Sequence, residues 1–217
     1  MADAPKRRGI SHLEKALNIY GIVLIIWSLY RFYFKLSQPL WFDEFIAKPA
    51  IFILPVWYFI SRYEKKSLAE GLHFRTKSPV IDIIAGLLIG SVFFIISALR
   101  ANGVHLVYPT VFLYVAIALA TSISEEIVAR GFILNRLYDS NKNAILSSIY
   151  ASILFFFLRV PILFVENKLA GSMLVQTLAV NFVLSLVISL LFVYRRSLTF
   201  AVAIHFMYAL SFYLFVS

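Results

Sequence analysis

The sequence from residue 107 to residue 137 reads VYPTVFLYVAIALATSISEEIVARGFILNRL, and this stretch decides what kind of protein folds around it. Its first half is almost entirely apolar, and apolar residues return after the charged group in its middle. A helix needs about 20 mainly apolar residues to cross the hydrocarbon core of a bilayer. The stretch therefore predicts a membrane-spanning helix, and because it is longer than a bilayer requires, we expect its Arg136 end to project into water.

The rest of the 217-residue chain has the same character, since 61% of its residues are hydrophobic and 14% are charged. A soluble domain is about half apolar and a quarter charged, so the composition excludes a soluble enzyme, a disordered tail and a coiled coil. The apolar runs are long and continuous, unlike the short alternating strands of a membrane β-barrel. The sequence predicts an all-α, polytopic transmembrane helix bundle.

Seven apolar helical segments can be drawn along the chain. They are Leu17–Phe34, Ile46–Ser61, Val80–Leu99, Val107–Leu137, Ala144–Val165, Ser172–Tyr194 and Leu198–Val216. The second segment is short and contains Lys48 and Pro55, which indicates a kinked or re-entrant helix. We expect a basic N-terminus at residues 1–16 and a single transmembrane helical domain at residues 17–217.

Positive charges are distributed unevenly between the loops. Thirteen of the 20 Lys and Arg residues lie in the N-terminus and the even-numbered loops, and only four lie in the other loops. Because cytoplasmic loops carry the excess of Lys and Arg, we expect the N-terminus in the cytoplasm. This bias accounts for the formal net charge of +9 without a nucleic-acid partner. We expect a multi-pass protein of the plasma membrane, in contact with the lipid bilayer and with its site facing the cytoplasm.

Charged residues inside the spans are the first candidates for a functional site, because each costs about 2.5–3.5 kcal/mol to insert. Glu125 and Glu126 point about 100° apart on a helix, so we expect different roles for them. Glu126 can pair with Arg130 at positions i and i+4. Glu125 is then left without a local partner, and an apolar cavity makes its carboxylate more basic and suited to general-base catalysis. The alternative is a helix end with ordinary solvated charges.

Further candidates lie on other spans. His205 is the only histidine inside a span and lies at a depth similar to that of Glu125, so it either joins a shared site or is a hydrogen-bonded structural residue. Arg159 either pairs with Glu125 or extends toward the outer interface. Lys48 and Asp82 lie near span ends, and we expect them to be solvated or to snorkel toward the interface. The chain has no cysteine, which excludes disulfides, Cys-ligated zinc and a Cys nucleophile.

Glu125, Glu126 and Arg130 form the pattern Glu-Glu-x-x-x-Arg, which resembles the first motif of the CAAX prenyl protease type II family. This family is also called the CAAX protease and bacteriocin-processing family, and the resemblance covers about residues 67–209. It implies an intramembrane endopeptidase in which Glu125 activates water. Glu126 and Arg130 would form a structural or substrate-orienting pair, and the substrate would be a membrane-associated peptide or protein, such as a prenylated one.

The family's second motif is Phe-x-x-x-His, and its third is His-x-x-x-Asn or His-x-x-x-Asp. At the matching places this chain has Phe155 with Arg159, and His205 with Ala209. The resemblance makes His205 an oxyanion donor, while Arg159 replaces the second-motif His and Ala209 replaces the Asn. Arg stays protonated in proteins and cannot act as a general base, although it can orient water or stabilise an oxyanion. If Arg159 reaches Glu125, it makes that carboxylate a poorer base.

The resemblance leaves the cofactor open, because the family is described both as metal-dependent and as a metal-free glutamate type. Glu125, Glu126 and one His supply too few imidazoles for a zinc site, so we expect no zinc and no other cofactor. Three functions remain as hypotheses. They are an intramembrane endopeptidase, a catalytically impaired pseudo-protease that binds or regulates a membrane partner, and a small transporter or channel.

Overall fold

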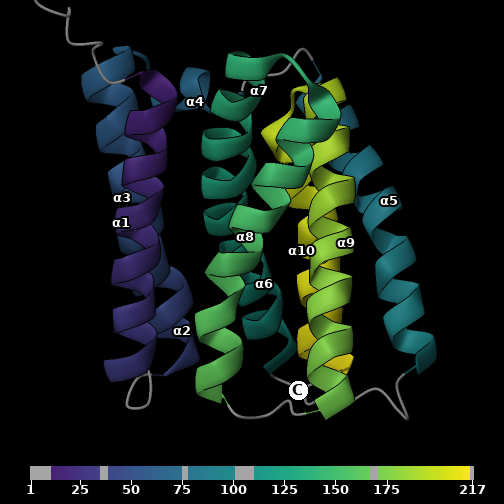
Figure 1. The fold of residues 1–217 in the computed structure, drawn as a ribbon. Coiled ribbons are helices and arrows are strands. Elements are labelled where there is room, and N and C mark those ends of the chain that lie inside the picture. The colour runs from purple at the N-terminus through teal and green to yellow at the C-terminus, as the bar shows by residue number, and fades with distance from the viewer. Residues whose placement is uncertain (1–10, 35–38, 75–77, 101–109, 167–170, 216–217) are drawn as a thin grey trace, which may run out of the picture.

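Every regular element that the structure describes is a helix (Figure 1). The computed structural model describes residues 11–34, 39–74, 78–100, 110–166 and 171–215. Its elements are α1 (His12–Tyr33), α2 (Leu40–Phe42), the π-helical η2 (Asp43–Ala47), α3 (Lys48–Phe59), the π-helical η3 (Ile60–Glu64), α4 (Leu68–Gly71), α5 (Pro79–Arg100), α6 (Thr110–Glu126), the π-helical η4 (Ile127–Leu134), α7 (Asn135–Asn141), α8 (Ala144–Glu166), α9 (Gly171–Arg195) and α10 (Leu198–Phe215).

Seven helical runs in the described residues are long and apolar enough to cross a membrane, which confirms the predicted all-α bundle and its number of spans. The second span is longer than the sequence indicated, because α2, η2, α3 and η3 form one run of 25 residues over Leu40–Glu64. The fourth combines α6, η4 and α7 over Val111–Asn141. The predicted boundaries at Val107 and Val216 lie outside the described residues.

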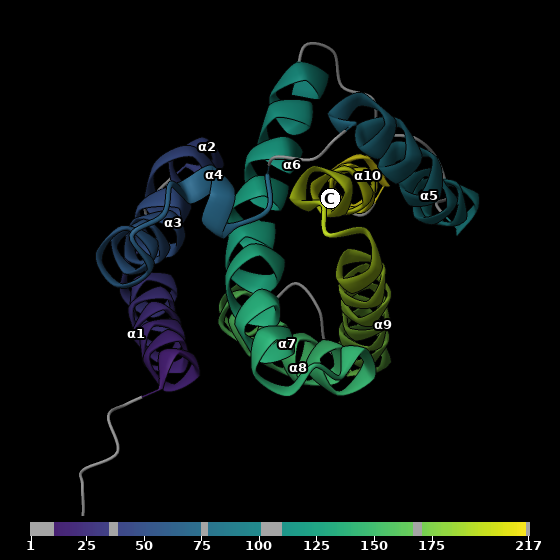
Figure 2. The same ribbon diagram turned by 90° about the horizontal axis from the view of Figure 1, so that it is seen from above.

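The long helices run roughly alongside one another, with α1 and α3 at one edge and α5 at the opposite edge (Figure 1). Seen from above, α10 lies between α5 and α6, while α8 and α9 pair with each other (Figure 2). Two hydrogen bonds join α1 to α8. The Tyr20 hydroxyl donates to the Leu154 carbonyl at 2.5 Å, and Trp27 Nε1 donates to the Leu158 carbonyl at 3.2 Å.

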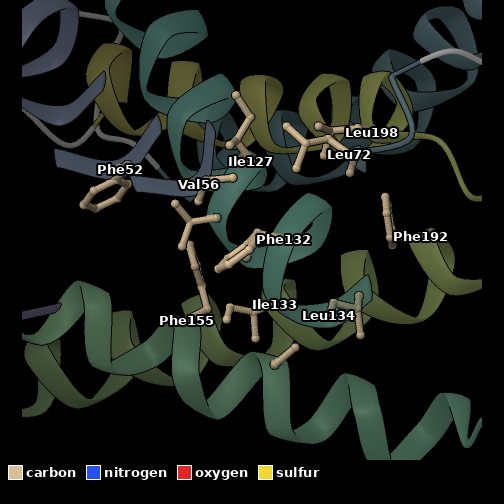
Figure 3. Close-up of a cluster of buried hydrophobic side chains, with 14 of the residues drawn as sticks. Phe52, Val56, Leu72, Ile127, Phe132, Ile133, Leu134, Phe155, Phe192 and Leu198 are labelled. Carbon is tan, nitrogen blue, oxygen red and sulfur yellow. The ribbon is translucent and has the colours of Figure 1, made fainter. Parts of the chain in front are cut away.

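A buried hydrophobic cluster joins the elements that carry the charged residues (Figure 3). Phe132 of η4 lies near its centre, and its ring meets the ring of Phe59 from α3 edge-on at 5.1 Å between centroids. Phe52 and Val56 of α3 and Phe155 of α8 belong to the same cluster. Each buried side chain of this size contributes about 1.5–3 kcal/mol, so the cluster fixes α3, η4 and α8 relative to one another.

Two charged side chains near the ends of spans, Arg136 and Asp82, are buried within the protein. Arg136 holds the Glu64 carboxylate at 2.8 and 2.9 Å through Nη2, and its Nη1 donates to the carbonyl of Gly131 at 2.7 Å. Asp82 lies beside Arg195, whose Nε donates to it at 2.7 Å. The prediction was wrong for Asp82, because its partner is distant in the sequence and pairing removes the need for water. That the Arg136 end of the helix extends beyond the bilayer stays a prediction.

Helices α5 and α10 approach closely because Gly86 and Gly90 face α10. A Cβ atom at position 90 would lie 2.7 Å from Met207 Cβ and 2.9 Å from the Ile204 carbonyl oxygen. We expect Gly90→Ala to separate the two helices and lower the free energy of unfolding by about 1–3 kcal/mol. The midpoint of thermal unfolding in detergent measures this loss.

Gly21 on α1 provides the matched control for Gly90, because no atom lies within 4 Å of where its Cβ would be. Gly21→Ala should leave stability unchanged or raise it by up to about 1 kcal/mol, the ordinary helix preference for Ala. Equal effects of the two substitutions would contradict a tight α5–α10 contact.

His73 links the α4 connection to α7 and lies outside the spans. Its Nε2 is 3.1 Å from Asn135 Oδ1, and the His73 carbonyl accepts from the Leu198 amide at 3.2 Å. Burial lowers the pKa of His73, and the nearby Arg196 guanidinium lowers it further. The unfolded chain therefore binds a proton at a higher pH than the folded one does, so stability should fall as the pH drops below about 6.5.

The midpoint of thermal unfolding, measured from about pH 8 to about pH 5, reports this pH dependence. That range spans the ordinary pKa of His, about 6.5. His73→Asn should reduce the pH dependence, because Asn does not titrate. The variant should still fold, because Asn keeps a polar side chain and tolerates the left-handed backbone (φ 57°) at this position. An unchanged slope in His73→Asn would assign the pH dependence to other groups.

Candidate active site

The acidic pair lies where the fourth span changes from α-helix to π-helix. Helix α6 ends at Glu126, and η4 begins at Ile127. Both carboxylates are buried, and every residue of η4 is buried as well. Short π-helical segments occur frequently at functional sites, because they redirect the side chains on either side.

Glu126 is held by two partners from different directions. Arg130 Nη1 donates to Glu126 Oε1 at 2.8 Å, and the same oxygen lies 2.7 Å from His205 Nδ1 on α10. Arg130 also binds α9, because its Nη2 donates to the Ser185 carbonyl at 2.9 Å and to the Ser185 hydroxyl at 2.8 Å. Glu126 and Arg130 thus pair, as their i, i+4 spacing predicted, and the pair links α6 to α9 and α10.

The contacts of His205 define which ring nitrogen carries the proton. Nε2 is 3.1 Å from Arg159 Nη2, and an arginine can only donate. Nε2 is therefore the acceptor in this contact, and Nδ1 carries the proton that points to Glu126. The Nε2 lone pair thus faces Arg159, and Glu125 Oε2 lies 3.7 Å from Nε2.

Two cations from distant parts of the sequence lie beside Glu125, and one of them is Arg159, whose pairing with Glu125 was one of the two alternatives from the sequence. Arg159 Nη2 lies 2.7 Å from Oε2, and Lys48 Nζ lies 3.2 Å from Oε1. Arg159 therefore points inward toward Glu125. Its side chain is still 19% exposed, whereas those of Glu125 and Lys48 are 3% and 1% exposed.

The two oxygens of Glu125 differ in their hydrogen bonding. Oε1 accepts from Lys48, whereas Oε2 accepts no hydrogen bond of good geometry from the described residues, although Arg159 is close. A carboxylate oxygen has two lone pairs, so Oε2 keeps acceptor capacity. That oxygen is the one that faces His205 and Arg159.

Lys48 was expected to be solvated or to snorkel near a span end, and this prediction was wrong. Its ammonium group is buried between two carboxylates, Glu125 and Glu44, with Glu44 oxygens at 2.5 and 2.8 Å. Glu44 also accepts from the Thr121 hydroxyl at 2.7 Å. The signal in the sequence was the i, i+4 pair Glu44–Lys48 in an apolar segment, where two charges insert most cheaply together.

Phe155 forms an apolar wall next to the charged groups. Its ring lies 4.8 Å from the Arg130 guanidinium carbon, 5.4 Å from that of Arg159 and 6.0 Å from the His205 ring centroid. The second-motif aromatic residue therefore packs against both arginines. Ala209, one turn after His205, is buried and brings no polar side chain to the site.

The described residues thus place a charge-balanced cluster inside the bundle. Three carboxylates (Glu44, Glu125 and Glu126) face three permanent cations (Lys48, Arg130 and Arg159), with His205 among them. All five residues predicted for the site from the sequence lie in this one cluster. Buried charges are expensive unless they are paired, and in this cluster the carboxylates and the cations are equal in number.

A metal ion fits this cluster poorly. Among the described residues, no group of three or more His, Asp or Glu side chains converges in a way that could hold one. The single imidazole has both nitrogens occupied, and Glu125 has Lys48 and Arg159 at the positions where a divalent cation would compete. We therefore derive no chemical step through a metal.

Comparison with known proteins found a family model that matches part of the chain. Residues 107–211 match the family model for type II CAAX prenyl endopeptidases, described as Rce1-like. The match confirms the resemblance predicted from the motifs, and this segment of the chain carries the sequence signature of that family. It includes α6 to α9 and most of α10, and leaves Lys48 and Glu44 outside. Neither a curated protein nor a solved structure matches the chain.

Proposed function

We propose that the protein is an intramembrane endopeptidase that hydrolyses a peptide bond in a membrane-associated substrate, such as a prenylated one. The supporting observation is the approach of His205 Nε2 to Glu125 Oε2 (3.7 Å) inside an apolar bundle. Both atoms can accept a hydrogen bond, so together they can bind the two protons of one water molecule. We place this site toward the cytoplasmic side of the plasma membrane, because the loop charges favour that orientation.

In the proposed reaction, the substrate carbonyl oxygen meets Arg159 first, because Arg159 is the more exposed of the groups around Glu125. The guanidinium turns from Glu125 toward that oxygen and leaves Oε2 free to accept a proton from water. The water oxygen bonds to the carbonyl carbon, and the negative charge on the carbonyl oxygen is stabilised by Arg159. Glu125 then passes its proton to the amine as the C–N bond breaks.

The proposal is tested by incubating the purified protein in liposomes with a peptide anchored by a lipid chain. We expect cleavage of the anchored peptide, with one ¹⁸O atom from labelled water in the new carboxyl group. Liposomes prepared from the same host without the protein are the control. A panel of anchored peptides that stays intact, with folded protein present, would refute the proposal.

We expect the activity to need no divalent cation. Chelation by EDTA or 1,10-phenanthroline should leave the cleavage rate within about twofold of the untreated rate, because the donor set fits a metal poorly. Adding Zn²⁺ back should give no gain. A loss of activity with chelator that zinc restores would show that a metal takes part.

A second function is favoured by the two cations on Glu125. Arg159 at 2.7 Å and Lys48 at 3.2 Å stabilise the ionised carboxylate, and an ionised carboxylate so well paired is a weak base. In this alternative the bundle is a pseudo-protease that binds or regulates a membrane protein or peptide. Variants that place the family's motif residues at positions 159 and 209 distinguish the two functions.

A further inference from the structure

Lys48 lies in the site although it belongs to a part of the chain that the family match does not include. It is the first residue of α3, directly after the π-helical η2. The π-helical turn precedes it immediately, and Glu44 within that turn is its i, i+4 partner. The ammonium group of Lys48 thus reaches Glu125 from a helix that contributes none of the recognised motif residues.

The position of Glu44 is itself fixed. It accepts a hydrogen bond at 2.7 Å from the hydroxyl of Thr121, which is one turn before Glu125 on α6. Helix α6 therefore binds both members of the Glu44–Lys48 pair. Thr121 donates to Glu44, and Glu125 accepts from Lys48. Lys48 is held at a defined place along α6, beside one particular oxygen of Glu125.

Structural need alone does not account for this pair. Replacing a buried ion pair by uncharged side chains of similar volume is often neutral or stabilising, and charges inside a span are costly. Helices α3 and α6 could pack through apolar residues, as α3 and η4 do in the core around Phe132. The pair is better explained by what it does to Glu125.

We propose that Lys48 is a positioning residue of this site, which binds Glu125 Oε1 and so leaves Oε2 as the reacting oxygen. A carboxylate bound at one oxygen has its rotamer fixed, and its other oxygen then faces Arg159 and His205. Lys48 acts through Glu125 and does not touch the substrate, since its side chain is 1% exposed. The inference rests on the proposed peptidase function for its kinetic consequences and on geometry for its effect on Glu125.

The test compares the wild type with the double variant Lys48→Met, Glu44→Gln, which removes both charges of the pair and preserves side-chain volume. We expect the thermal midpoint to stay near that of the wild type, kcat to fall about 10–100-fold and KM to stay unchanged, because misplacing a catalytic group costs that much. Thr121→Val, which removes the bond to Glu44 but keeps both charges of the pair, should have a smaller effect on kcat. A double variant with wild-type kcat would overturn the proposal.

A second readout is independent of turnover. Dicyclohexylcarbodiimide modifies protonated carboxyl groups in apolar surroundings, and mass spectrometry can locate the adduct at Glu125. We expect severalfold faster labelling of Glu125 in the double variant, because Oε1 has lost its cation. Unchanged labelling would overturn the role of Lys48. If the wild type cleaves no substrate but labelling rises as expected, the peptidase proposal fails and the positioning of Glu125 by Lys48 stands.

Discussion

Replacing Glu125 with Gln should lower kcat for cleavage of a lipid-anchored peptide by about 10²–10⁴-fold, the usual contribution of a general base. Gln has the same shape as Glu but cannot accept a proton from water. The substrate carbonyl still meets Arg159, so KM should change little. Initial rates in liposomes over a range of substrate densities separate the two constants.

The control for Glu125→Gln must account for the charges around it. Without the carboxylate, Lys48 keeps Glu44, whereas Arg159 loses its only carboxylate ion pair in the described residues. Glu125→Asp keeps the charge but withdraws it by one methylene, so it should retain the fold and give an intermediate rate. A folded Glu125→Gln variant with wild-type kcat would exclude Glu125 as the base and, with it, the proposed mechanism.

Much of the architecture was predictable because lipid imposes simple rules. A span must satisfy its backbone internally and present apolar side chains over about 20 residues, so length and composition reveal it. The second span was underestimated because Asp43 and Glu44 made its beginning look polar. In the structure these residues are buried by pairing, which hydropathy does not register.

The site was predictable where its residues are close in sequence or belong to a motif, as with Glu126 and Arg130. It was not predictable where partners come from distant helices. Lys48 is 77 positions from Glu125, and Arg136 is 72 positions from Glu64. The sequence does not reveal which of several buried charges will pair. That depends on how the helices pack and on how the π-helical segments turn the side chains of a helix.

The combined variant Arg159→His, Ala209→Asn should raise kcat by at least about tenfold. Restoring His at 159 removes a permanent cation from Glu125 Oε2 and supplies a group that can hold water. Asn at 209 adds an amide donor one turn after His205, and a single donor to an oxyanion is worth about 10²–10³ in rate. Because Ala209 is buried, the larger side chain costs about 1–3 kcal/mol of stability, and the thermal midpoint must be measured with the rate.

The parent protein and this variant together decide between peptidase and pseudo-protease. Measurable cleavage by the parent, increased in the variant, is expected for a peptidase that uses Arg159 in place of His. Cleavage only in the variant would establish the parent as a pseudo-protease whose Arg159 closes the site on Glu125. Equal rates in both would show that Arg159 already performs the task of the missing His, and that a donor at 209 is not needed. The single variants Arg159→His and Ala209→Asn assign the change to one position, since the removal of a cation from Glu125 and the gain of a donor beside His205 act on different steps.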